Sequence, residues 1–189
     1  MFFSCKKEDN QNNTIGTYAE SGSAIVVNEG NYGSNNGSVS FVDRNGLVTN
    51  YIYENANSGI NLGDVIQSYT RIGNKGIICV NNSFKIEIVD ARTFKHLETI
   101  VATTATQNTS YVRYALGIDD NKAYVTNGNF AGEVEVINLS TNTITKSINV
   151  GKGPEQLVMV DNNVYVCNSG GFDVDSTVSI INTTTDVVT

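Results

Sequence analysis

A repeat of about 45 residues constrains the fold of this chain more than any other feature. Each copy contains a β-rich run that ends in Asn, a loop, and a second β-rich run that ends in Asp or Asn. The first runs end at Asn28, Asn81, Asn127 and Asn168, and the second runs end at Asp43, Asp90, Asn138 and Asn182. Further β-rich segments precede and follow each pair, without a helical pattern between them. The repeat therefore predicts four-stranded sheets that act as the blades of a β-propeller.

The chain holds about four such blades, at residues 24–53, 66–101, 113–150 and 155–189. The runs are apolar at successive positions, which is typical of sheets buried on both faces. One Pro, 17 Gly and no Trp fit many short strands joined by turns. We predict an all-β fold in which these blades form part of a ring. The repeated Asn is expected to be structural, because Asn accepts left-handed backbone geometry and bonds its own backbone.

The N-terminus resembles the end of a lipoprotein signal peptide. Cys5 follows a small residue and a short apolar stretch, and a charged segment comes after it. We expect residues 1–5 to be the remnant of the signal, Cys5 to be the lipidated residue and residues 6–22 to be a polar tether. A chance cysteine is the alternative. Cys79 and Cys167 lie in apolar runs and are expected to be small buried side chains.

The charge and the titratable residues exclude several functions. A net charge of −7 opposes binding to nucleic acid. The single histidine, His96, falls in an expected outer strand and is predicted to be exposed rather than catalytic. Glu133 and Glu135 share a strand face without a partner acid, base or nucleophile, so we interpret them as solvated or packing-face charges. We predict no catalytic residue, no metal and no cofactor.

Two segments resemble a known family. Residues 124–127 read Tyr-Val-Thr-Asn, the motif of the YVTN class of β-propellers. Residues 27–35 read VNEGNYGSN, which is similar to the opening blade of YncE-like surface lipoproteins of Bacteroidota. The resemblance covers about residues 24–189 and includes the BtuG-like cobalamin-binding group. It implies a seven-bladed ring, of which this chain is a part, and an outer-membrane location at the cell surface through a lipid anchor.

Propellers bind ligands at the mouth of the central channel. The loops expected there are 28–38, 81–85, 127–132 and 168–176, together with 54–65, 101–112 and 151–154. Their candidate ligand-binding residues are Glu29, Asn31, Tyr32, Asn82, Asn129, Phe130, Phe172 and Asp173. Aromatic rings beside amide and carboxylate groups suit a large, flat, partly polar ligand. The alternative is that these residues are ordinary loop surface.

Three functions follow from these observations. The first is a non-catalytic surface lipoprotein that captures a small molecule, with cobalamin or another corrinoid as the ligand implied by the resemblance. Its partner would be a TonB-dependent outer-membrane transporter. The second is an adhesion or surface-layer module, which would bind polymers or cells. The third is a lyase or quinoprotein-type enzyme on a similar propeller, which would need histidines or paired carboxylates at the channel mouth.

Overall fold

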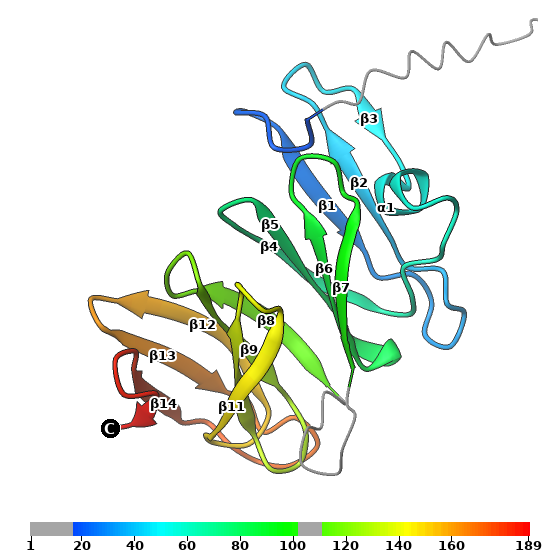
Figure 1. Ribbon diagram of the computed structural model, residues 1–189. Coiled ribbons are helices and arrows are strands. Elements are labelled where there is room, and N and C mark those ends of the chain that lie inside the picture. The colour runs from blue at the N-terminus through cyan, green and yellow to red at the C-terminus, as the bar shows by residue number, and fades with distance from the viewer. Residues whose placement is uncertain (1–16, 102–110) are drawn as a thin grey trace, which may run out of the picture.

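The computed structural model describes residues 17–101 and 111–189, which form a succession of four antiparallel sheets (Figure 1). The first blade contains β1 (Ala24–Asn28), β2 (Ser38–Val42) and β3 (Val48–Thr49). The second contains β4 (Ile66–Ile72), β5 (Lys75–Val80), β6 (Lys85–Asp90) and β7 (His96–Val101). The third contains β8 (Val112–Gly117), β9 (Lys122–Asn127), β10 (Glu133–Asn138) and β11 (Thr143–Asn149). The fourth contains β12 (Pro154–Val160), β13 (Asn163–Asn168), β14 (Val178–Asn182) and β15 (Val187–Val188).

The predicted all-β propeller architecture is confirmed, and three of the four sheets have the expected four strands. The innermost strands β4, β8 and β12 lie next to one another. The first blade differs, because β1 is equivalent to β5, β9 and β13 but pairs with β2 alone among the described residues. Cys5 and residues 6–16 of the predicted tether lie outside the described part of the chain. Within that tether Tyr18 packs edge-on against Phe41 and Phe94.

A short helix replaces strand structure at the end of the first blade. Residues 24–53 were expected to contain strands, yet β3 ends at Thr49 and α1 (Ile52–Ala56) follows. Tyr51 adopts a left-handed conformation, which turns the chain before the helix. Ile52 and Tyr53 are then buried against the first two blades. Burial of these two side chains accounts for the change, since apolar contact outweighs the weak strand preference of such a short segment.

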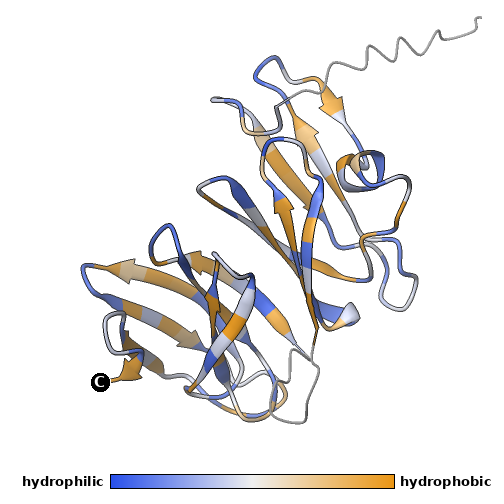
Figure 2. Cartoon of the chain, viewed as in Figure 1, coloured by the Kyte–Doolittle hydropathy of each residue, from blue (hydrophilic) through white to orange (hydrophobic). Residues whose placement is uncertain are grey.

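The core consists of three apolar layers, one between each pair of consecutive blades. In β5, Ile78 and Val80 face the first blade, whereas Ile77 and Cys79 face the third. Both faces of the middle blades are therefore buried, as the apolar runs predicted. Figure 2 shows the apolar residues along these strands.

The fourth blade has one covered face and one open face. Val166 is buried against the third blade, but Val158, Val160 and Val178 are exposed. Cys79 is buried as expected, whereas Cys167 is exposed, so the prediction for Cys167 was wrong. The reason is strand alternation, which turns Cys167 toward the open face while its neighbours point inward.

The repeated Asn has a different structural role from the one expected. Its backbone is not left-handed at any of the four positions. In three blades its side chain instead donates to a polar side chain of the next strand along the chain, which is β2, β10 or β14. The bonds run from Asn28 to Ser40 (3.1 Å), from Asn127 to Glu135 (3.2 Å) and from Asn168 to Ser179 (3.0 Å). The Asn thus satisfies a polar group inside the sheet.

Residues 17–101 and 111–189 include no helix long and apolar enough to cross a membrane.

Candidate functional site

A cavity of about 590 Å³ lies where the loops of the four blades meet at one end of the inner strands. Its lining comes from every blade and consists of Tyr32, Asn81, Asn82, Tyr111, Arg113, Gly128, Gly153, Glu155, Gly171 and Phe172. These residues occupy the second-to-third strand loops and the starts of the inner strands. The position is the channel mouth at which propellers were expected to bind ligands.

The charged residues of the lining, Arg113 and Glu155, lie at the starts of inner strands. Gln67 in β4, Arg113 in β8 and Glu155 in β12 each lie at a shift in register within their strand. A β-bulge re-aims the side chain that it carries and bends the strand. The same irregularity in three consecutive inner strands therefore gathers these three side chains at one level.

Arg113 links the three inner strands directly. Its Nε donates to both carboxylate oxygens of Glu155, at 3.0 and 3.1 Å, and its Nη1 donates to Oε1 of Gln67 at 2.6 Å. The side chains of Arg113 and Glu155 are 28% and 27% exposed, so both still reach the cavity. Charge-assisted bonds of this kind are short and directional. The guanidinium is consequently held in one orientation at the base of the cavity.

Three aromatic residues, Tyr32, Tyr111 and Phe172, form another part of the lining. Tyr111 contacts Phe84 on one side, with ring centroids 6.2 Å apart, and Phe172 on the other, at 5.5 Å. Phe172 also contacts Phe130 at 5.6 Å. Phe130 and Phe172 remain 75% and 69% exposed, and Tyr32 is 81% exposed. Large exposed rings beside a cavity offer apolar faces on which a flat ligand can stack, and such contact removes those faces from water.

The buried Asp64 supports the part of the lining that contains Tyr32 and Asn82. Oδ2 of Asp64 accepts a bond from the backbone nitrogen of Gly33 (2.7 Å) and from Nδ2 of Asn82 (2.6 Å). Asp64 is 6% exposed, and its Oδ1 has no partner among the described residues. Asp64 therefore joins the loop that carries Tyr32 to the second blade and orients the amide of Asn82.

The loop that carries Phe172 is tied to the connection between the third and fourth blades. Lys152 pairs with Asp173, and the backbone nitrogen of Lys152 donates to Asp175 (2.8 Å). The bond from Lys152 lowers the pKa of the Asp173 carboxyl below its ordinary value. Gly153 has a left-handed backbone, and a Cβ there would lie 2.2 Å from the nitrogen of Gly171. Close backbone contact at this glycine places the Phe172 loop beside the cavity.

The structure brings together part of the predicted set of site residues. Tyr32, Asn82 and Phe172 line the cavity, and Phe130 adjoins it through Phe172. Glu29 and Asn31 are exposed on the loop of Tyr32 but are not part of the lining. Asn129 is buried and bonds Glu133 and Gly132, while Asp173 pairs with Lys152. The segment 102–110 of one predicted loop lies outside the described residues.

Sequence reasoning missed Arg113, Tyr111 and Glu155. Glu155 lies one residue beyond the predicted loop 151–154, yet it is part of the lining. The available signal was positional, because Gln67, Arg113 and Glu155 are each the second residue of an inner strand. Aligning the inner strands of successive repeats would have placed three polar side chains on one level.

His96, Glu87 and Glu135 are not part of the lining of the cavity. His96 places its Nδ1 2.5 Å from Oε1 of the buried Glu87, and it is partly exposed as predicted. Glu135 is fully buried, where it bonds Asn127 and Ser147, so it occupies the packing face rather than solvent. Burial raises the pKa of Glu135 above its ordinary value. No group of three or more potential metal-ligating His, Cys, Asp or Glu residues occurs within 17–101 and 111–189.

Comparison with solved structures supports the propeller fold. The WD40 β-propeller domain of Doa1 matches 90% of this chain with a TM-score of 0.64 and 11% identity, over 50% of that domain. Hydrazine synthase of Kuenenia stuttgartiensis matches 80% with a TM-score of 0.64 and 18% identity, over 41% of that chain. BamB from Moraxella catarrhalis matches 88% with a TM-score of 0.58 and 13% identity, over 45% of that chain. The chain thus spans about half the length of these structures, and the likeness concerns the fold alone.

Among curated proteins, none matches this chain. A family model does match, and it covers residues 22–189, which include all four blades and the whole lining of the cavity. The chain therefore belongs to the family described as Domain of unknown function (DUF5074).

Proposed function

We propose that this protein is a non-catalytic binding module that captures a flat, partly polar small molecule in the channel-mouth cavity. The observation that carries the proposal is that Tyr32, Tyr111 and Phe172 line the same cavity as the Arg113–Glu155 pair. Flat aromatic walls favour a conjugated or ring-shaped ligand, and the polar base fixes its orientation.

The size and construction of the cavity support ligand capture. Its volume of about 590 Å³ is within the range of small-molecule sites. Its polar side chains are already held by partners within the protein, through Glu155 for Arg113 and through Asp64 for Asn82. A site that is ordered before binding avoids part of the entropic cost of association.

A corrinoid is the ligand that we propose to test first. The resemblance of residues 27–35 and 124–127 to YncE-like surface lipoproteins motivates this choice. In the same proposal Cys5 carries the lipid anchor, the protein lies at the cell surface, and a TonB-dependent outer-membrane transporter receives the ligand. Corrinoids combine a broad flat ring with polar side groups, which fits the aromatic wall and polar base.

The experiment is a calorimetric titration of the protein with cyanocobalamin. We expect saturable one-to-one binding that is weakened at least about tenfold in Phe172→Ala, because the ring loses its stacking surface. The matched control is Val174→Ala, which lies on the same loop, is 89% exposed and does not line the cavity. Absence of binding would show that a corrinoid is not the ligand. Binding that Phe172→Ala leaves unchanged would contradict the proposed site.

A further inference from the structure

The charge of the cavity is balanced by a single pair of side chains. Among the described residues of the lining, Arg113 and Glu155 are the two that carry charge, and their signs are opposite. The remaining lining side chains are aromatic, amide or glycine. The cavity therefore contains a cation, Arg113, that could bind an anionic ligand. The carboxylate of Glu155 already pairs with this cation.

The geometry of the pair directs Glu155 at the guanidinium edge rather than into solvent. Nε of Arg113 contacts both carboxylate oxygens, at 3.0 and 3.1 Å, and Nη1 is engaged by Gln67. Guanidinium groups recognise carboxylates, sulfonates and phosphates through these same edges. An incoming anion would have to displace Glu155 or lie close to it, and both are unfavourable in a partly buried site.

The arrangement follows from the repeat. The three bulged inner strands carry Gln67, Arg113 and Glu155 at equivalent positions, so a neutral, a positive and a negative side chain lie in order around the channel. Arg113 lies between the other two and bonds both Gln67 and Glu155. The charge balance is thus a property of three adjacent blades and depends on one residue from each.

We propose that Glu155 is a specificity-determining residue, which neutralises Arg113 and makes the cavity select uncharged ring ligands over anionic ones. This inference rests on the proposed function, because it concerns ligands of the same cavity. Rejection of the wrong ligand by a repulsive charge is a common source of specificity. The class of ligand is therefore a flat molecule without net negative charge at the end that meets the inner strands.

Two dyes with one ring system test the proposal. N-phenyl-1-naphthylamine is uncharged, and 1-anilinonaphthalene-8-sulfonate differs from it by one sulfonate. Both fluoresce more strongly in apolar surroundings, so dissociation constants can be measured by titration. The open apolar face of the fourth blade can also bind dye. Binding to the cavity is therefore defined as the part that Phe172→Ala removes.

We expect the wild-type cavity to prefer the uncharged dye by at least about tenfold. In Glu155→Gln the guanidinium is no longer neutralised, so the affinity for the sulfonate dye relative to that for the uncharged dye should rise at least about tenfold. The double variant Arg113→Gln/Glu155→Gln should restore the wild-type preference. The control Asp120→Asn removes the same charge from an exposed turn and should leave the ratio unchanged.

Each outcome bears on the proposal. An unchanged dye ratio in folded Glu155→Gln, or equal cavity binding of both dyes by the wild type, would overturn the role of Glu155 and leave the cavity as a binding site. If Glu155→Gln fails to fold, Arg113→Gln leaves the Glu155 carboxylate without its cation and should bind the sulfonate dye more weakly relative to the uncharged dye than the wild type does, and an unchanged ratio in that variant would overturn the role of Glu155. If Phe172→Ala leaves the binding of both dyes and of cyanocobalamin unchanged, the proposed function itself fails.

Discussion

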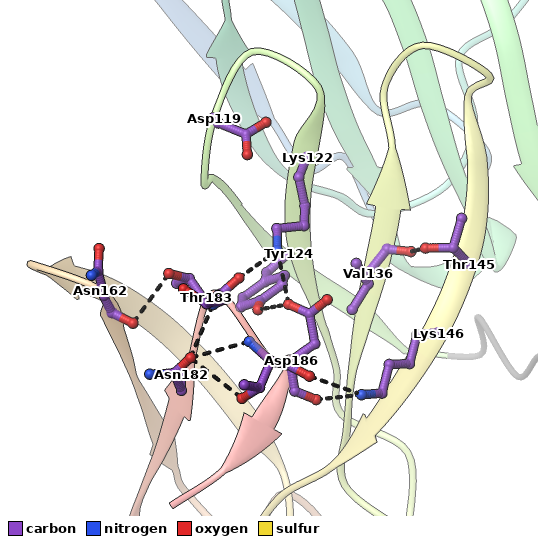
Figure 3. A network of polar contacts seen from close by, with 12 residues as sticks. Asp119, Lys122, Tyr124, Val136, Thr145, Lys146, Asn162, Asn182, Thr183 and Asp186 are labelled. Atoms are coloured by element: carbon purple, nitrogen blue, oxygen red, sulfur yellow. Dashed lines mark hydrogen bonds and ion pairs between the residues drawn. The ribbon is translucent and has the colours of Figure 1, made fainter.

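Lys122 of the third blade places its ammonium 3.0 Å from the carboxylate of Asp186 in the last turn of the fourth blade (Figure 3). The same ammonium donates to the carbonyl of Thr183 at 2.5 Å. One blade earlier, Lys75 makes the equivalent contact, with the side chain of Asn142 at 2.6 Å. Lys75 and Lys122 are both the first residue of a second strand. A lysine at the first position of the second strand thus joins the second blade to the third and the third blade to the fourth, in addition to the apolar layers between them.

Replacement of Lys122 by Met is expected to destabilise the protein by about 1–3 kcal/mol. The change removes bonds to a carboxylate and a carbonyl that are partly buried, and Asp186 loses its positive partner. Urea unfolding followed by circular dichroism measures the loss. Lys95→Met is the matched control, since Lys95 is exposed and should change stability by less than about 0.5 kcal/mol. Equal losses in both variants would show that the contact with Asp186 contributes nothing.

The buried Glu135 predicts a specific pH dependence. Burial raises the pKa of Glu135 in the folded protein above the ordinary value of 4.5. The protonated carboxyl therefore stabilises the fold fully below about pH 4.5, and this contribution is lost as the pH rises through the folded-state pKa. Glu135→Gln lacks this titration.

We expect the stability of Glu135→Gln relative to the wild type to increase from pH 4.5 to pH 7. The urea concentration at the midpoint of unfolding, measured for both proteins at pH 4.5 and at pH 7, checks this expectation. Glu98→Gln, at an exposed position of β7, is the control for loss of one carboxylate. A difference between Glu135→Gln and the wild type that stays constant with pH would contradict the assignment.

Much of the fold could be predicted from the sequence, because each strand has a local signature and the repeat supplies the register. The predicted second blade, 66–101, coincides with β4 to β7, and the ends of the next two blades differ by about one residue. The helix α1 was missed, since its five residues carry no helical periodicity and form through tertiary burial of Ile52 and Tyr53.

The candidate site was less accessible to sequence reasoning. Tyr32 and Phe172 could be predicted because they are aromatic residues within polar loops between the apolar strands, and both line the cavity. Arg113 and Glu155 were missed because their role depends on bulges that turn strand residues toward the channel. Asn129 appeared available for a ligand, but its side chain is used by Glu133 and Gly132. Tertiary pairing therefore decides which polar residues remain accessible.

Asp64 is expected to shape the wall of the cavity from behind. Asp64→Ala removes the acceptor of the Gly33 nitrogen and of the Asn82 amide, which should cost about 1–3 kcal/mol of stability. It should also weaken cavity binding of the uncharged dye at least about threefold, because Tyr32 and Asn82 lose their fixed positions. Asp64→Asn keeps an acceptor oxygen and should retain most of the affinity. Loss of stability in Asp64→Ala without any change in dye affinity would contradict the positioning role.

Gly153 provides a test of the loop that carries Phe172. Its φ is 55°, and an added Cβ would meet the backbone of Gly171 at 2.2 Å. Gly153→Ala should therefore destabilise the protein by more than the cost of about 1–2 kcal/mol for a left-handed Ala. It should also displace the loop and weaken dye binding in the cavity.

Gly46→Ala separates these two effects. Gly46 has a φ of 84°, and no described atom lies within 4 Å of an added Cβ, so this variant carries the conformational cost without the contact. Urea unfolding and dye titration of both variants provide the comparison. We expect Gly153→Ala to lose more stability and more affinity than Gly46→Ala. Equal effects would mean that the Phe172 loop does not depend on close contact with the connection between the third and fourth blades.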